Sequence, residues 1–330
     1  MIASVMRHER LAVALAVGLG GIWTGSCGGE GTAPSPVPAA SPTPFPANPS
    51  CGGCAALPCT RECLPALATG LPALRPYSDG ACPTLQRGAN RGFGFGKRDF
   101  LLFVPTRTNG PFGLVFLWHG SGGSAQGFTF LASATDPSGY EAGGYILVIP
   151  DGQLRYPLDW AMDHRGIDHD LRFYDDVVAC VSRQFPVDRR RVHTTGYSAG
   201  AVFSAYLMGY RSDSVASLSA WSTGEADPAN RRMVPDPPRP VPGLLYHGGP
   251  RDTPDWAGRQ GTLALAQHMA ANGALAIVCD HGLGHVVPGP LDATLGQMWS
   301  FMLAHPFGLE PAWATGNLAG RLPGWCAVVL

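Results

Sequence analysis

The chain has 330 residues, of which 45% are hydrophobic and 14% charged, with 44 glycines and 31 prolines. This composition excludes global disorder and provides a sizeable core, in one large catalytic domain or two ordinary ones. The 23 basic and 24 acidic residues give a net charge of −1 and form no basic stripe interleaved with aromatic residues. We therefore expect no nucleic acid partner.

The N-terminal 27 residues read as an export signal. Arg7, His8 and Arg10 precede an apolar run at 11–23 that is short for a membrane span. The run ends in small residues followed by Cys27, which is typical of a bacterial lipoprotein signal whose cysteine becomes lipidated. Thr24 occupies a place where leucine is usual, so ordinary signal cleavage is the alternative. We predict an extracellular or cell-envelope protein that contacts the membrane only through a lipid on Cys27.

Two further segments separate this signal from the main body. Residues 28–50 are rich in Pro, Ser and Ala, which predicts a linker. Residues 51–88 begin with four cysteines spaced CxxC-x4-C-x3-C. Because no matching second pair or histidine partner follows, we favour a disulfide-stapled segment over a zinc site. Without Cys27, eight cysteines remain for up to four disulfides, whose pairing the sequence leaves open.

From residue 89 to 310 short apolar runs alternate with helical patterns. The expected strands are 99–106, 113–120, 144–152, 190–196, 218–224, 242–249 and 275–280. The expected helices are 170–185, 199–210, 261–273 and 291–305, with Asp170 as an N-cap. This alternation predicts an α/β domain with a mostly parallel central sheet flanked by helices. Residues 311–330 form a tail in which Cys326 suggests a staple to the body.

The candidate nucleophile is Ser198 in the sequence GYSAG at 196–200, between an expected strand and an expected helix. A strand–turn–helix of this kind strains the serine backbone and exposes its hydroxyl, which only small neighbours allow. The motif alone arises easily by chance in a glycine-rich chain. Its position between an expected strand and an expected helix is what favours a catalytic serine.

A serine nucleophile needs a base and an acid that orients the base. His285 lies in the glycine-rich loop GLGHVVPG after the last expected strand, and His281 is its rival. Asp252 lies in the loop after GLLY, and Asp255 is the alternative acid. The chain order Ser198, Asp252, His285 is that of an α/β-hydrolase.

The expected oxyanion hole combines two backbone N–H groups, one from Ala199 and one from the loop HGSGGS at 119–124, where Ser121 is the favoured donor. This loop lacks the lysine ending of a phosphate-binding P-loop and the second half of a dinucleotide fingerprint.

Together these segments resemble the polyhydroxybutyrate depolymerase-like esterases, which include feruloyl and acetyl-xylan esterases. The matching segments are LWHGSGGS, VIPDG, DLRF at 170–173, VDRRRVHTTGYSAG, LLYHGGPRD and GLGHVVPG. The resemblance implies an α/β-hydrolase fold, exported serine esterase activity without a cofactor or metal, and the roles given above to Ser198, Asp252 and His285.

The chain departs from this family at several places. The spacing in HGGPRD is one residue longer than usual, which keeps Asp255 open as the acid. Ala201 and Ser121 replace a common glycine and a common cysteine, and Val287 stands where the family has a tryptophan. Trp160 is a candidate replacement wall for the substrate, with core packing as its alternative. Tyr197 and His119 are the other candidate substrate contacts.

The sequence thus predicts an exported serine esterase acting on a small-molecule or polymer ester, either acyl groups linked to polysaccharides or hydroxyalkanoate esters. A serine peptidase on the same fold and an inactive envelope-binding lipoprotein are the alternatives.

Overall fold

The computed structural model describes residues 71–106, 109–133, 139–153, 158–162, 167–225, 234–288, 291–314, 318 and 321–329. These residues belong to one compact unit, which spans Ala56–Leu330. The predicted export signal with Cys27, the linker and the four clustered cysteines lie outside the described residues.

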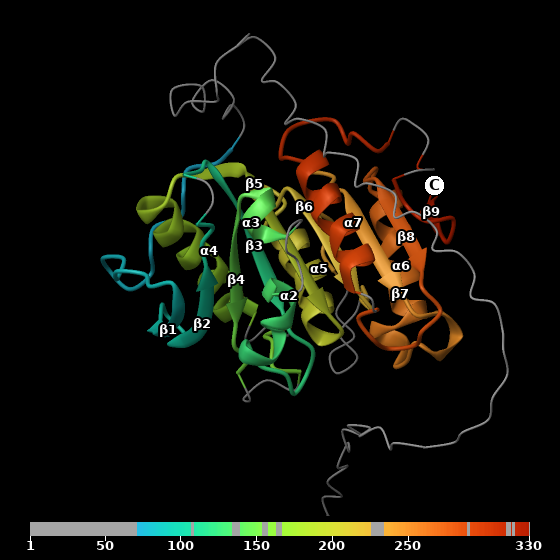
Figure 1. Cartoon of the computed structure of the whole chain (residues 1–330), viewed down its shortest axis with the longest axis horizontal. Helices are drawn as coiled ribbons and strands as arrows, with labels where there is room; N and C mark the ends of the chain where they lie inside the picture. The colour runs from blue at the N-terminus through green and yellow to red at the C-terminus, as the bar shows by residue number, and fades with distance from the viewer. Residues whose placement is uncertain are drawn as a thin grey trace, which may run out of the picture. The chain divides into compact units, whose positions relative to one another are not determined.

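A nine-stranded sheet forms the centre of the molecule, in the order β1-β2-β4-β3-β5-β6-β7-β8-β9 (Figure 1). Strands β3 to β8 are mutually parallel, while β2 and β9 pair antiparallel to this central set. The strands are β1 (Gly88–Phe93), β2 (Arg98–Phe103), β3 (Phe112–Trp118), β4 (Tyr145–Pro150), β5 (Val187–Tyr197), β6 (Ser217–Trp221), β7 (Gly243–His247), β8 (Ala276–Asp280) and β9 (Cys326–Val329). The predicted mostly parallel sheet is confirmed.

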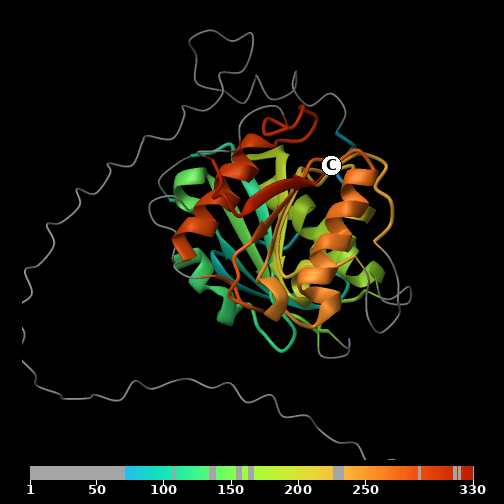
Figure 2. The same cartoon turned by 90° about the vertical axis from the view of Figure 1, so that its right-hand side faces the viewer.

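Helices cover both faces of this sheet. One buried cluster joins the sheet to α4 (Ile167–Gln184), α5 (Ala199–Tyr210) and α6 (Arg259–Ala271), and a second joins it to α7 (Leu291–Ala304). Figure 2 shows α7, in red, and α6, in orange, on opposite sides of the strands. Shorter elements lie in the connections: η1 (Gln126–Phe128), α2 (Phe130–Ser133), α3 (Tyr140–Gly143), η2 (Gly249–Arg251) and η3 (Asp255–Ala257). Among the described helices none is long and apolar enough to cross a membrane.

The prediction that Asp170 caps a helix is wrong. Helix α4 already begins at Ile167, and the Asp170 side chain is fully buried against Arg98, with which it forms an ion pair. Its second oxygen accepts a hydrogen bond from the Ala161 N–H at 2.6 Å. Asp170 therefore joins β2, α4 and the segment after β4, because a buried carboxylate requires such partners.

Two disulfides attach the ends of the described chain to the sheet layers. Cys82 bonds to Cys180 on α4, and Cys279 on β8 bonds to Cys326 on β9. The expected staple between Cys326 and the body is thus confirmed, with Cys279 as the partner that the sequence left open. Cys326 is the first residue of β9, which pairs with β8 along its whole length and forms an edge strand of the sheet.

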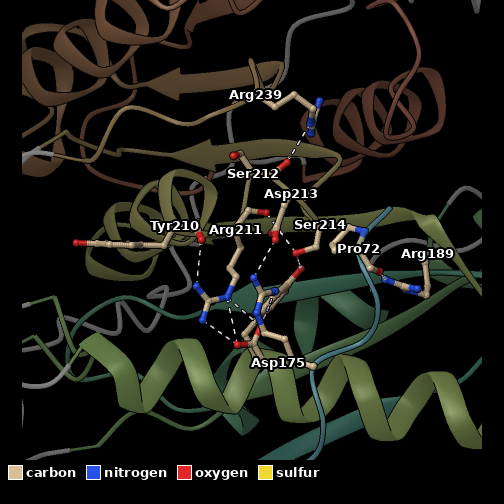
Figure 3. A network of polar contacts seen from close by, with 11 residues as sticks. Pro72, Asp175, Arg189, Tyr210, Arg211, Ser212, Asp213, Ser214 and Arg239 are labelled. Carbon is tan, nitrogen blue, oxygen red and sulfur yellow. Dashed lines mark hydrogen bonds and ion pairs between the residues drawn. The ribbon is translucent and has the colours of Figure 1, made fainter. Parts of the chain in front are cut away.

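Residues 71–87, which we call the N-terminal arm, are fastened by a polar network at the amino ends of the strands (Figure 3). Arg75 pairs with Asp213 at 2.8 Å and with Asp175 on α4 at 3.5 Å. Asp175 also receives a forked ion pair from Arg211, at 2.8 and 2.9 Å. Near the start of β5, Arg189 donates a hydrogen bond to the carbonyl of Pro72. The arm is therefore held at the opposite edge of the sheet from the ends of β5 and β7.

Candidate active site

The carboxyl ends of the parallel strands bring the predicted loops together. Strands β3, β5, β7 and β8 end at Trp118, Tyr197, His247 and Asp280, immediately before the loops in which chemistry was expected. Because these strands are parallel, all four loops leave the same edge of the sheet, which is where sites form in open α/β folds.

Ser198 occupies a strained turn between β5 and α5. Its backbone has φ 54° and ψ −124°, a conformation that residues with a side chain rarely adopt. A Cβ at Gly200 would lie 2.1 Å from the Trp118 carbonyl oxygen, and one at Gly196 would lie 2.6 Å from Gly200. Larger residues at either position would push the strand and helix apart, so both glycines are needed for the turn.

Ser198, His285 and Asp252 form one hydrogen-bonded series. The Ser198 Oγ lies 2.9 Å from His285 Nε2, and His285 Nδ1 lies 2.6 Å from Asp252 Oδ1. The Asp252 side chain is fully buried, whereas the His285 side chain is 21% exposed. Because a carboxylate can only accept, Nδ1 carries the proton and Nε2 is free to accept one from Ser198.

The second oxygen of Asp252 has its own donors. Asp252 Oδ2 accepts the Gly248 N–H at 2.8 Å and the Ser222 hydroxyl at 3.0 Å. The sequence reasoning missed Ser222, which the structure buries completely just after β6. Inspecting the first residue after every parallel strand, and not only the glycine-rich loops, could have found it.

The rival residues lie elsewhere. Asp255 is exposed on η3, and none of the hydrogen bonds between described residues joins it to His285. His281 accepts a hydrogen bond from the Leu283 N–H through Nδ1 at 3.3 Å. Burial lowers the pKa of His281. The structure thus brings together the favoured set of the sequence analysis, Ser198, Asp252 and His285.

Two glycines allow the acid loop and the histidine loop to touch. The Gly284 N–H donates to the Gly248 carbonyl at 2.9 Å, and a Cβ at Gly248 would lie 1.9 Å from the Gly284 oxygen. This close contact fixes His285, the next residue, beside the loop that carries Asp252.

The loop after β3 packs against the serine turn. A Cβ at Gly120 would lie 3.3 Å from the Ser198 Cβ. Farther along the loop, the Gly122 N–H donates to Asp159 Oδ2 at 2.5 Å and the Ala125 N–H to Asp151 Oδ1 at 2.7 Å. These carboxylates tie the loop down and were not predicted as site residues.

The two expected oxyanion donors are left available by these bonds. In the described part of the chain no group accepts a hydrogen bond from the Ser121 N–H. Ala199 is the first residue of α5, where a backbone N–H has no partner within the helix. The N–H groups of Ser121 and Ala199 are therefore both free to donate to a bound oxygen atom next to Ser198.

The structure corrects the substrate-binding roles expected for His119 and Trp160. His119 is fully buried, with Nδ1 2.8 Å from the Gly120 carbonyl and Nε2 accepting the Gly152 N–H at 2.9 Å. Burial lowers the pKa of His119, which fits an uncharged imidazole. Trp160 is 1% exposed, donates to the His119 carbonyl at 2.8 Å and packs edge-on against Trp118. Both side chains pack in the core behind the loop at 119–124 and have almost no exposed surface to offer a substrate.

Tyr197 links the serine turn to the histidine loop. Its hydroxyl donates to the His285 carbonyl at 2.7 Å, and the two rings lie 5.1 Å apart between centroids. Burial and the charge of Asp252 raise the pKa of Tyr197 to about 12. These contacts give Tyr197 a part in holding His285, in addition to the substrate contact that the sequence analysis expected.

Exposed apolar side chains occur close to His285 in the sequence. Leu283 and Val286, on either side of His285, are 52% and 42% exposed. The Phe128 and Tyr197 rings lie 6.4 Å apart between centroids. Val287, which stands in place of the family's tryptophan, packs partly buried against the α7 layer. Among the described residues no cluster of His, Cys, Asp or Glu could hold a metal ion.

Known proteins share this architecture. No family model matches the chain. Feruloyl esterase D from Neurospora crassa is 27% identical over 175 residues, which cover 48% of this chain and 56% of the relative. The chain therefore spans little more than half the length of that relative.

Two solved structures are similar over most of the described chain. The native form of pOPH has a TM-score of 0.60 at 18% identity, covering 75% of this chain and 97% of its own. Native sOPH has a TM-score of 0.59 at 18% identity, covering 76% and 96%. The parallel sheet and these likenesses show an α/β-hydrolase fold.

Proposed function

We propose that the chain is an exported serine esterase that hydrolyses carboxylic esters through an acyl-enzyme, with Ser198 as nucleophile, His285 as base and Asp252 as acid. The observation that carries this proposal is the unbroken hydrogen-bonded series from the Ser198 hydroxyl to the buried Asp252 carboxylate.

In the first step, His285 Nε2 takes the proton of Ser198 as Oγ attacks the ester carbonyl. The proton then passes to the leaving alcohol, and the acyl group stays on Ser198. Asp252 keeps the imidazole in the required tautomer and stabilises its positive charge, which is the work of the third member in such a triad.

The tetrahedral intermediate places negative charge on the carbonyl oxygen. The N–H groups of Ala199 and Ser121 stabilise this charge, and removing one such donor costs about 10²–10³ in kcat. In the second step water attacks the acyl-enzyme with His285 again as base, which releases the acid and restores Ser198.

We further propose that the esters are acyl groups linked to polysaccharides, feruloyl or acetyl, or hydroxyalkanoate esters. The likeness to a feruloyl esterase supports this substrate class. The exposed Leu283 and Val286 beside His285 support an ester with an apolar part, since they offer apolar surface to it.

Export is supported by the two disulfides, because such bonds persist in oxidising compartments outside the cytoplasm. Lipidation of Cys27 remains a prediction from the sequence. Replacing Cys27 by Ala should move the expressed protein from the membrane fraction to the soluble fraction.

The central test compares Ser198→Ala with the wild type on p-nitrophenyl acetate and butyrate, and in labelling by a fluorophosphonate probe. We expect both hydrolysis and labelling to disappear. Ser219→Ala, which removes another buried hydroxyl, is the matched control. Hydrolysis that survives in Ser198→Ala would contradict the proposal.

A second assay addresses the substrate. Methyl ferulate, acetylated xylan, hydroxybutyrate oligomers and a peptide amide are offered to the wild type under identical conditions. Turnover of one of the esters supports the proposed class, whereas preferential cleavage of the amide would favour a serine peptidase.

A further inference from the structure

We propose that Ser222 is a positioning residue that fixes and polarises the Asp252 carboxylate, so that the series from Ser198 to Asp252 extends to a fourth member. This inference rests on the proposed esterase function.

The contact is a buried hydrogen bond to a charged group. The Ser222 Oγ lies 3.0 Å from Asp252 Oδ2, and both residues are at most 2% exposed. An ionised carboxylate only accepts, so the Ser222 hydroxyl donates. Its removal would leave Oδ2 with the Gly248 N–H as its remaining donor among the described residues.

The backbone conformation of Ser222 points its side chain toward Asp252. Its φ is 52°, and its N–H donates to the Tyr246 carbonyl at 2.8 Å. Few residues with a side chain adopt such a φ, and strain of this kind is found at functional sites. The turn at Ser222 ends β6 and directs the hydroxyl toward the acid loop.

The same turn also contacts the nucleophile. The carbonyl of Trp221, the residue before Ser222, accepts the Ser198 N–H at 3.0 Å. Two consecutive residues at the end of β6 therefore touch the nucleophile through a carbonyl and the acid through a hydroxyl. The end of β6 thus contacts both Ser198 and Asp252, the two ends of the series.

The chemical consequence follows from charge. A donor to Oδ2 stabilises the carboxylate and restricts its rotation about the Cβ–Cγ bond. Without that donor, the carboxylate attracts the proton on His285 more strongly and points at Nδ1 less steadily. The proposed reaction begins with a neutral His285. Without the Ser222 donor, hydrolysis should therefore be slower and should reach its full rate only at a higher pH.

The test compares Ser222→Ala, Ser222→Gly and Ser219→Ala with the wild type on p-nitrophenyl butyrate. Ser222→Ala removes the hydroxyl, and Ser222→Gly removes it while relieving the strain at φ 52°. Ser219, also buried on β6, has a hydroxyl without a hydrogen-bond partner among the described residues, so it is a matched control. Thermal unfolding of all variants identifies any loss of fold.

We expect kcat to fall about tenfold in both Ser222 variants, with KM within twofold, since a hydrogen bond to a charged group is lost. We also expect the acidic limb of the kcat/KM profile to move to higher pH by roughly half a unit, which a merely structural role would not cause. Ser219→Ala should match the wild type in both measurements.

Two outcomes separate the hypotheses. A folded Ser222→Gly variant with wild-type kcat and an unchanged pH profile overturns the inference while the esterase proposal stands. A wild type that neither hydrolyses these esters nor reacts with a fluorophosphonate overturns the esterase proposal itself.

Discussion

The two edges of the parallel sheet hold their polar side chains in different ways. At the carboxyl edge, Ser198, His285 and Asp252 form a linear series in which each contact is made by one hydrogen bond. At the amino edge, Arg211 pairs with Asp175 (Figure 3). Arg75 also pairs with Asp175, and it reaches Asp213 as well.

This difference separates two tasks. The series at the carboxyl edge holds His285 so that it can exchange a proton with Ser198, and the loss of any member removes either that exchange or the alignment that it needs. A branched network fastens the N-terminal arm by several contacts and moves no proton. Changes at the carboxyl edge should therefore reduce the rate of hydrolysis, whereas changes at the amino edge should reduce the free energy of unfolding.

The largest effect is expected from Asp252→Asn. The amide group would face the donors that now point at the carboxylate and would favour the wrong tautomer of His285, so kcat should fall about 10⁴-fold. Steady-state hydrolysis of p-nitrophenyl butyrate measures this loss. Asp255→Asn, three residues away and exposed, should keep wild-type activity. The reverse pattern would make Asp255 the acid.

The core of the fold was predictable because its strands are uniformly apolar. Strand β3, for example, is buried along its whole length, and its sequence already has that pattern. Strands β1 and β9 were missed because they are the two edge strands of the sheet, where exposed positions break the apolar run. The staple at Cys326 hinted that the tail returns to the body, but not that it forms a strand.

Within the site, the sequence was sufficient to predict the residues that lie in glycine-rich segments, such as Ser198 and His285. It missed Ser222 and Asp159, whose partners come from distant loops and leave no local pattern. It also gave His119 a substrate contact and left Trp160 open between a substrate wall and core packing, because sequence position places a side chain near a loop without telling which way it faces. Burial decides that question, and burial depends on the packed structure.

The first test of the amino edge uses His305, which follows α7 near the start of β5. Burial, with a smaller contribution from Arg321, lowers the pKa of His305 to about 4. The unfolded chain binds a proton near pH 6.5, so stability should be lost as pH falls from about 6.5 to about 4.

The lowered pKa of His305 corresponds to a loss of about 3 kcal/mol in the free energy of unfolding across that pH range. Chemical denaturation at pH 7, 5.5 and 4 measures the loss. The His305→Gln variant, which cannot take up the proton, should show a shallower decline. An equal decline in the variant and the wild type would mean that other buried histidines, such as His193, account for it.

A smaller loss is expected from Asp175→Asn. The change removes a carboxylate that pairs with two arginines at a largely buried position, and we expect the free energy of unfolding to fall by about 2 kcal/mol. Asp213→Asn, which affects a more exposed pair, should cost less. Hydrolysis by both variants should equal that of the wild type. A loss of kcat in Asp175→Asn would show that the two edges are coupled.

The smallest effect is expected from Tyr197→Phe, which tests how far the carboxyl edge depends on bonds outside the triad. The variant loses only the hydroxyl that donates to the His285 carbonyl at 2.7 Å. If Tyr197 holds the histidine loop, kcat should fall about fivefold with KM unchanged, since one neutral hydrogen bond contributes about 1 kcal/mol.

A substrate contact through the hydroxyl would instead raise KM and leave kcat unchanged, because it would act on binding and not on the alignment of His285. Measuring both constants for Tyr197→Phe on p-nitrophenyl acetate and butyrate therefore decides between the two roles. An effect that is equal for both esters supports positioning, because the alignment of His285 does not depend on the length of the acyl chain.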